Sequence, residues 1–164
     1  MPHSQDNTEI YPRIRPVEAS HIADLIRIGS ETNLSTWTAQ NYLDELQIAE
    51  AIMLRLESAV NETIGFIVGR IVQGGTIETE KDAEIYNVAV IDSEQGKGLG
   101  QLIFDAFVEK CHDLGVRNIW LEVRASNQKA IRFYEQSGFE HVQSRNNFYE
   151  NPREHALLMK LILK

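Results

Sequence analysis

The chain has 164 residues, of which 43% are hydrophobic and 24% are charged, values ordinary for a soluble globular protein. Its formal net charge is −8, which argues against a nucleic-acid-binding protein, because such proteins usually present a basic face. No apolar run approaches the roughly 20 residues that span a bilayer. The single cysteine, Cys111, excludes an intrachain disulfide and indicates a reducing cytoplasm.

The first half of the chain predicts one strand, two helices and then three strands. The first nine residues are polar and show no secretory leader, so we expect a flexible tail over 1–10 followed by a single domain over 11–164. Thr38 is a suitable N-cap for the second helix. The expected elements are a strand at 13–17, helices at 18–29 and from 38 to about 46, and strands at 51–57, 63–72 and 83–90.

The stretch from Asn87 to Gly100 carries the strongest local signal. A β-branched run gives way to a turn and then to alternating glycines at Gly96, Gly98 and Gly100. Glycines between a strand and a helix allow a tight turn and a close approach to a ligand. The first N–H groups of such a helix lack internal partners and lie at the positive end of its dipole, so the junction suits a phosphate or pyrophosphate.

The helix after the glycines is expected to bury one apolar face. The spacing of apolar residues assigns to that face Leu99, Leu102, Ile103, Ala106, Phe107 and Leu114.

Three phosphate-binding motifs can be compared with this stretch. A Walker loop needs Ser or Thr after its Gly-Lys, but Gly98 follows Lys97. The dinucleotide fingerprint is G-x-G-x-x-G, whereas the spacing here is G-x-G-x-G; Glu122 lies near the distance where that fingerprint expects an acidic residue, which keeps it as a weaker alternative. A third pattern, Q/R-x-x-G-x-G/A, matches every fixed position from Gln95 to Gly100.

The second half predicts a strand at 118–124, a helix at 127–136 that Gly138 ends in the left-handed cap position, and strands at 140–143 and 156–163. The whole order is β-α-α-β-β-β-α-β-α-β-β. A dinucleotide-binding domain would instead alternate strands and helices from a fingerprint near its start. The order of elements therefore disfavours that alternative.

Several segments resemble one known family. The Gln95–Gly100 pattern resembles the pyrophosphate loop of the GNAT N-acetyltransferases. The segments NIWLEVRASN at 118–127 and AIRFYEQSGF at 130–139 resemble the signature of its RimI-type branch, the ribosomal-protein alanine N-acetyltransferases. The similarity continues through RNNFY at 145–149 and LLM at 157–159 and covers about half of the chain.

The chain also departs from the branch pattern. Thr36 replaces the usual Pro before Trp37, Ile91-Asp92 replaces the usual Asp-Pro, and Phe148 stands where Tyr is common. These departures bear on the choice of substrate more than on coenzyme binding.

The resemblance implies a GNAT fold of the α/β (α+β) class. This fold has a mixed central sheet of about seven strands, splayed at its centre, and about four helices. It implies acetyl-CoA as cosubstrate, held by freed backbone groups of the strand that ends at Val90 and by the glycine loop. The residues expected to bind it are Val88, Ala89, Val90, Gln95, Gly96, Lys97, Gly98, Leu99, Gly100, Gln101 and Asn127.

Glu122 is the most informative single residue. It lies in the middle of a strand that such folds cover on both faces. A buried carboxylate is costly unless it is paired with another group, so its presence there indicates either an ion pair or a functional role. One interpretation is an ion pair with Arg124, two residues on and on the same face. The resemblance implies the other, a general base that removes a proton, through a water, from an α-amine of pKa about 7.7–8.0.

Tyr134 and Asn127 each have two interpretations. Tyr134 is either a core aromatic or, as the resemblance implies, the general acid; a phenol of pKa near 10 can protonate a thiolate whose acid has a pKa of about 8.5. Asn127 has the position of an N-cap, and the matching residue of the family also contacts the coenzyme. The histidines show no metal-ligand spacing, so we expect no metal.

The resemblance places the acceptor between the link that carries Trp37 and the segment 145–149, so Trp37, Asn147 and Tyr149 are expected to bind substrate. The leading hypothesis is a cytoplasmic enzyme that acetylates the N-terminal α-amine of a protein, a ribosomal protein with an N-terminal alanine. An acetyltransferase of a small amine or internal lysine and a non-catalytic acyl-CoA sensor remain alternatives. No nucleic acid or membrane partner is expected.

Overall fold

The computed structural model describes residues 9–32, 34, 37–75 and 79–164, and its order of elements confirms the predicted one. Of the expected tail, residues 1–8 lie outside the described residues, as does Thr36, and the limits of the domain stay a prediction. The elements are β1 (Arg13–Pro16), η1 (Ala19–His21), α1 (Ile22–Glu31), α2 (Ala39–Leu46), β2 (Ala51–Glu57), β3 (Thr63–Gln73), β4 (Lys81–Val90), η2 (Asp92–Glu94), α3 (Leu99–Asp113), β5 (Val116–Arg124), α4 (Gln128–Gln136), β6 (Glu140–Tyr149) and β7 (Glu154–Ile162).

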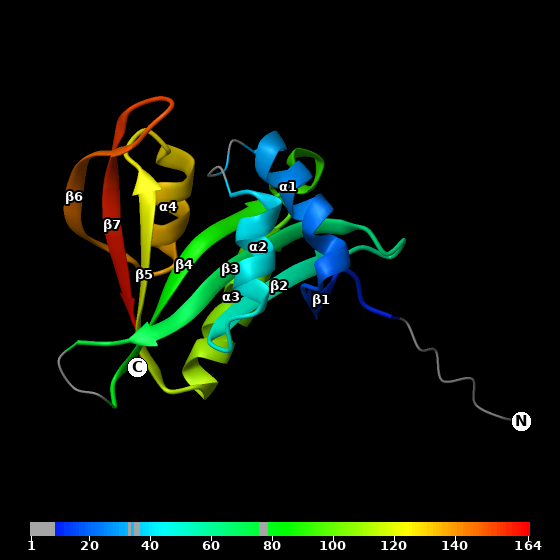
Figure 1. Cartoon of the computed structure of the whole chain (residues 1–164), viewed down its shortest axis with the longest axis horizontal. Coiled ribbons are helices and arrows are strands. Elements are labelled where there is room, and N and C mark those ends of the chain that lie inside the picture. Colours follow the sequence, from blue (N-terminus) through cyan, green and yellow to red (C-terminus); the bar gives the residue numbers. More distant parts are fainter. Residues whose placement is uncertain (1–8, 33, 35–36, 76–78) are drawn as a thin grey trace, which may run out of the picture.

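One mixed sheet organises the molecule. Its strand order is β1-β2-β3-β4-β5-β7-β6, and every neighbouring pair is antiparallel except β4 and β5, which run parallel. The helix α3 connects these two parallel strands, as a parallel pair requires a crossover. None of the described helices is both long and apolar enough to cross a bilayer. Figure 1 shows α1 and α2 together on the near side of the sheet.

A hydrophobic core fills each face of the sheet. One core packs α3 and α4 against the strands, and the other packs α1 and α2. Gly69 of β3 permits the first packing, because a Cβ there would lie 2.5 Å from both the Phe107 ring and the Glu84 carbonyl oxygen. Completely buried residues of the first core include Leu56, Ile67, Ile103, Phe107, Ile119 and Met159, and those of the second include Leu25, Ile28, Phe66 and Val68.

The predicted apolar face of α3 is partly wrong. Leu102 is 40% exposed, and Leu114 is 49% exposed and lies at the C-cap, beyond the helix. Phe104, which was not predicted, is buried and packs against the rings of Phe133 and Phe139. Phe104 is buried because the rings of Phe133 and Phe139 lie against it, whereas Leu102 faces solvent.

The strand β6 is longer than the predicted strand at 140–143. It continues to Tyr149 as the edge strand beside β7, and its side chains up to Phe148 are exposed. Backbone pairing with β7 supports it, with irregular register between Arg145 and Tyr149. Apolar alternation could not reveal this extension, because the side chains of β6 stay exposed up to Phe148 and need not be apolar.

Candidate active site

The strands β4 and β5 part halfway along their length. Their parallel pairing runs from Lys81 and Val116 to Ile85 and Leu121. Beyond that point β4 stays paired with β3 as far as Val90, and β5 stays paired with β7 as far as Arg124. Figure 1 shows the two strands diverging toward their C-terminal ends. The predicted splay at the centre of the sheet is confirmed.

A β-bulge lies at the point of divergence. In the β3–β4 ladder Val68 pairs with Asn87 and Gly69 with Ile85, so Tyr86 has no partner position of its own. An extra residue in one strand bends that strand and increases its local twist. The bulge therefore accounts for β4 turning away from β5 just after Ile85.

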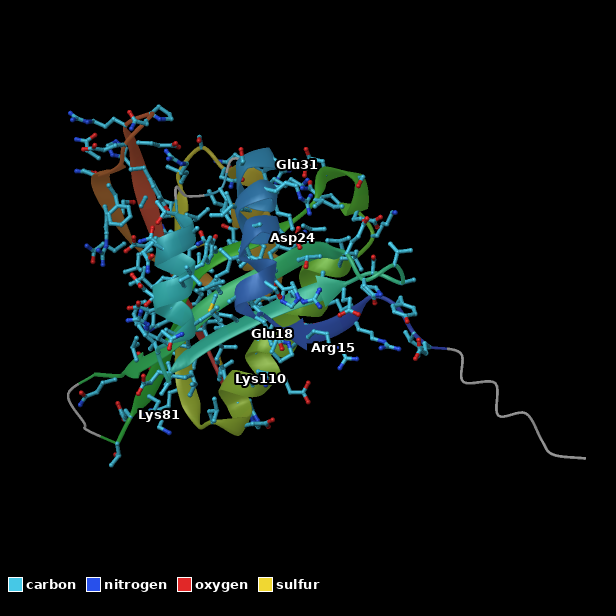
Figure 2. All side chains as sticks on the ribbon, turned by 45° about the vertical axis from the view of Figure 1, so that its right-hand side comes forward. Arg15, Glu18, Asp24, Glu31, Lys81 and Lys110 are labelled. Carbon is cyan, nitrogen blue, oxygen red and sulfur yellow. The ribbon has the colours of Figure 1, made fainter. Side chains whose placement is uncertain are left out.

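A cavity of about 680 Å³ lies at the open end of the wedge, and we call it the glycine-loop cavity. Its wall includes the end of β4, the glycine turn and part of α4, and Tyr134 is one of the lining residues of α4. In Figure 2 Glu31, another lining residue, lies at the far end of the molecule from Lys81, where β4 begins. The predicted coenzyme residues that line this cavity are Val88, Ala89, Val90, Gln95, Gly96, Gly98, Leu99, Gly100, Gln101 and Asn127.

The glycine turn presents open space and a helix terminus to this cavity. Gly96 and Gly98 have φ of 78° and 79°, the left-handed region that disfavours other side chains, and a Cβ on either would meet no atom within 4 Å. Gly98 is the N-cap of α3, and the first intrahelical bond runs from the Leu102 N–H to its carbonyl at 3.1 Å. The N–H groups of Leu99, Gly100 and Gln101, which precede Leu102, have no carbonyl partner within the helix and can therefore bind an anionic ligand.

Gln95 and Lys129 connect the turn to α4. The Gln95 amide donates to the Val90 carbonyl at 2.9 Å and to Asp92 Oδ1 at 3.2 Å. Its Oε1 accepts a hydrogen bond from Lys129 Nζ at 2.7 Å, so Lys129 brings a positive charge to the glycine-loop cavity. Lys129 was not predicted from the sequence, because a single lysine on a helix resembles any solvated surface residue. Lys97 lies outside this lining and pairs with Glu94 at 3.0 Å.

A second cavity of about 600 Å³, here called the aromatic cavity, contains Glu122. It adjoins β4 from Asp82 to Tyr86, the stretch up to and just past the end of the pairing with β5, whereas the glycine-loop cavity adjoins Val88 to Val90. Its wall includes the aromatic residues Trp37, Tyr86, Trp120, Phe148 and Tyr149 and the charged residues Asp82, Glu84, Glu122 and Arg145.

Two of the three predicted substrate residues line the aromatic cavity, and the third does not. Trp37 and Tyr149 line the aromatic cavity, and the Trp37 ring lies 5.6 Å from that of Tyr86. Asn147 lies outside this lining. It has a φ of 52°, and its N–H donates to His155 Nδ1 at 3.0 Å, so its backbone shapes the β6–β7 hairpin.

Glu122 forms its ion pair with Arg145, so the interpretation that paired it with Arg124 is wrong. The Glu122 Oε1 lies 3.2 Å from Arg145 Nε, and the Glu122 side chain is 23% exposed. Arg124 instead lies 3.4 Å from Glu154 and over the ring of Tyr149. Burial raises the pKa of Glu122, the Arg145 charge opposes this rise, and Glu84 adds to it. A carboxylate with a raised pKa is suited to general-base chemistry.

Tyr134 is a buried phenol at the wall of the glycine-loop cavity. It is 7% exposed and packs against the rings of Phe133 and Phe139. Burial raises its pKa, so the hydroxyl stays protonated and available as a proton donor. Asn127 is confirmed as the N-cap of α4, because its Oδ1 accepts from the Ala130 N–H at 3.2 Å.

Neither a reactive thiol nor a metal site emerges from the described part of the chain. Cys111 is fully buried, and burial raises the pKa of its thiol to about 12. Within the described ranges no group of His, Cys, Asp and Glu side chains is arranged to hold a metal ion.

Comparison with known proteins identifies the family. Residues 22–139 match the sequence profile of the acetyltransferase (GNAT) family. The [ribosomal protein bS18]-alanine N-acetyltransferase of Haemophilus influenzae is 32% identical over 154 residues, which cover 92% of this chain and 98% of that protein. The Escherichia coli protein of the same name is 39% identical over 82 residues, or 49% of this chain and 55% of its own length.

A solved structure agrees in fold. The crystal structure of the ribosomal-protein-S18-alanine N-acetyltransferase from Escherichia coli superposes with a TM-score of 0.80 at 26% identity, covering 93% of this chain and 94% of that chain. The parted strands, the glycine turn at the start of α3 and the match over 22–139 lead to one conclusion. The chain belongs to the GNAT family of acetyltransferases.

Proposed function

We propose that this chain transfers the acetyl group of acetyl-CoA to the N-terminal α-amine of a protein, a ribosomal protein with an N-terminal alanine. One observation carries the proposal: the glycine-loop cavity at the open end of the wedge has Tyr134 at its wall, and the aromatic cavity, beside the point where β4 and β5 part, has Glu122 at its wall. The names of the bacterial relatives support the acceptor class. A cytoplasmic location follows from this acceptor, since ribosomal proteins are made there.

The residues of the glycine-loop cavity fit acetyl-CoA. Its pyrophosphate would lie at the N-terminus of α3, where Gly96 and Gly98 leave open space and Lys129 supplies a positive charge. The backbone of Val88 to Val90, unpaired on its β5 side, can form hydrogen bonds with the pantetheine amides. An N–H of Val88 or Ala89 would stabilise the negative charge that develops on the thioester carbonyl.

Glu122 and Tyr134 divide the proton transfers between them. An α-amine is mostly protonated at neutral pH, so Glu122 must first accept its proton, through a water. The raised pKa of Glu122 makes it a better proton acceptor for this step. Tyr134 then donates its phenolic proton to the departing thiolate, and burial among aromatic rings keeps that proton in place until it is needed.

The aromatic cavity suits the first residues of a peptide. Trp37 and Tyr149 would limit the size of the first side chain, and Glu84 and Asp82 make the surroundings acidic and favourable to basic residues. Asn147 would contribute from the hairpin turn. A small first residue such as alanine fits this enclosure better than a large one.

A panel of acceptors tests the proposal. Release of coenzyme A thiol should be measured with acetyl-CoA and peptides that start with Ala, Ser or Met, together with lysine peptides and polyamines. We expect a basic peptide with an N-terminal alanine to react well ahead of the others, with the acetyl group located on its α-amine by mass spectrometry. Acetylation of a lysine side chain, or turnover with polyamines alone, would favour the second hypothesis, and binding of acetyl-CoA without any turnover would favour the sensor.

A further inference from the structure

Arg145 has two alternative partners at the aromatic cavity. Its Nε lies 3.2 Å from Glu122, and its guanidinium carbon lies 5.7 Å from the centre of the Phe148 ring. The Arg145 side chain is 46% exposed, as is Phe148. The guanidinium can therefore leave the carboxylate without disrupting a packed core. The face of an aromatic ring is a favourable place for the displaced cation.

The carboxylates of this cavity differ in their partners. Asp82 accepts hydrogen bonds from the Asn118 amide at 3.0 Å and the Trp120 indole at 2.8 Å. Glu84 accepts from the Tyr86 hydroxyl at 2.8 Å. These donors are neutral, whereas the partner of Glu122 is a cation. An acceptor with an ammonium group must reach the Glu122 carboxylate, which the Arg145 cation already occupies.

We propose that Arg145 is a placeholder cation, which occupies the Glu122 carboxylate in the free enzyme and is displaced toward Phe148 by the ammonium group of the acceptor. This inference rests on the proposed function and concerns the same site. Once the ammonium is in place, one proton passes from it through a water to Glu122 and leaves a neutral amine. The guanidinium keeps its charge throughout. Arg145 is thus a positioning residue, because it acts through Glu122.

The surroundings of Glu122 determine how this exchange depends on pH. Glu84 on β4 raises the pKa of Glu122, and Arg145 on β6 lowers it. Tyr149, also on β6, faces the same carboxylate, and Leu158 pairs with Glu122 from β7. Without Arg145, burial and Glu84 act unopposed, so the pKa of Glu122 must rise. Since the base works when ionised, the acidic limb of kcat/KM must then move to higher pH.

The test compares Arg145→Gln with the wild-type enzyme in two measurements. In the first, the Glu122 carboxyl is titrated by NMR with 13C-labelled glutamate, without acceptor, and we expect it to titrate at higher pH in the variant. In the second, steady-state kinetics with an Ala-starting peptide are followed at a pH where Glu122 is ionised in both proteins. We expect the peptide KM to fall about twofold to fivefold, the ratio typical of a half-exposed ion pair, with little change in kcat.

Two further variants separate charge from shape. Arg145→Lys keeps the positive charge and should return the Glu122 titration close to that of the wild type. Arg124→Gln removes the same charge from a residue on the same strand as Glu122, which pairs with Glu154 instead, and should leave the Glu122 titration unchanged.

The outcomes distinguish the placeholder from the proposed function. An unchanged Glu122 titration in Arg145→Gln, or a higher peptide KM, overturns the placeholder. A wild-type enzyme that acetylates no N-terminal amine overturns the proposed function, while the NMR titration, which uses no acceptor, still reports whether Arg145 controls Glu122.

Discussion

The two cavities beside the wedge are built in different ways. Much of the wall of the glycine-loop cavity comes from one continuous run, Val88 to Gln101, and the rest comes from α4 with its N-cap and from the end of α1 and the residues after it. The aromatic cavity takes its wall from the five strands β3 to β7 and from Trp37, which precedes α2. A cavity built from a continuous motif can be found from sequence, whereas one assembled from distant strands depends on register. The lining of the glycine-loop cavity could thus be predicted for the most part from the sequence, whereas that of the aromatic cavity could be predicted only in part.

The substitution Glu122→Gln tests whether the aromatic cavity carries the base. We expect kcat to fall about 10²–10⁴-fold, the usual contribution of a general base. Because Glu122 must be ionised and burial raises its pKa, the kcat/KM of the wild type should decline at pH values above those of an ordinary glutamate. That limb should disappear in the variant. Glu140→Gln, at the exposed start of β6, provides the same chemical change as a control. Near wild-type rates in Glu122→Gln would mean that the amine loses its proton in bulk water.

The substitution Tyr134→Phe tests whether the glycine-loop cavity supplies the acid. We expect kcat to fall roughly 10²-fold, the low end for acid–base catalysis. Acetyl-CoA affinity should hardly change, because a Phe ring can keep the contacts with Phe133 and Phe139. Calorimetry and steady-state rates would measure the two effects, with Tyr11→Phe, outside both cavities, as the control. Loss of affinity in Tyr134→Phe would instead make the tyrosine a packing residue.

The substitution Gly98→Val tests the glycine turn itself. A valine would occupy the open space beside the N-terminus of α3, where the pyrophosphate of acetyl-CoA is proposed to lie. The overpacking of the bound complex should lower the affinity for acetyl-CoA roughly 10–100-fold. The φ of 79° also strains the backbone of any substituted residue. Gly115→Val is the matched control, because Gly115 has a φ of 78° and open space but lies outside both cavities. If both variants lose stability equally and both still bind acetyl-CoA, the turn is not part of the coenzyme site.

The smallest expected effect belongs to Lys129. The change Lys129→Gln should weaken acetyl-CoA binding about twofold to fivefold, as for other exposed charge pairs, and should reduce the dependence of the affinity on salt. Lys110→Gln is the control, since Lys110 lies in the last turn of α3, at the end remote from the glycines (Figure 2). Equal acetyl-CoA affinities in the two variants would mean that the run from Val88 to Gln101 binds the phosphates without help from Lys129.

Much of the fold could be predicted from the sequence. The strand at 51–57 and the Thr38 and Asn127 caps are as predicted, because local periodicity and capping chemistry determine them. The pairing of Glu122 with Arg145 could not be predicted, since it depends on the irregular register of β6 against β7. Lys129 could not be found either, because only the hydrogen bond to Gln95 distinguishes it from a surface lysine.

The short parallel ladder between β4 and β5 has a consequence for the cooperativity of the molecule. Within the described sheet, this ladder alone joins the half-sheet β1–β4 to the half-sheet of β5, β7 and β6, and it ends at Ile85 and Leu121 (Figure 1). The core under α3 also joins the two half-sheets, and a coenzyme lying between Val88 and Asn127 would add a further link. Ligand at 100 times its Kd adds about 2.7 kcal/mol to the free energy of unfolding. Bound coenzyme would therefore strengthen the coupling between the two half-sheets and raise the free energy needed to separate them.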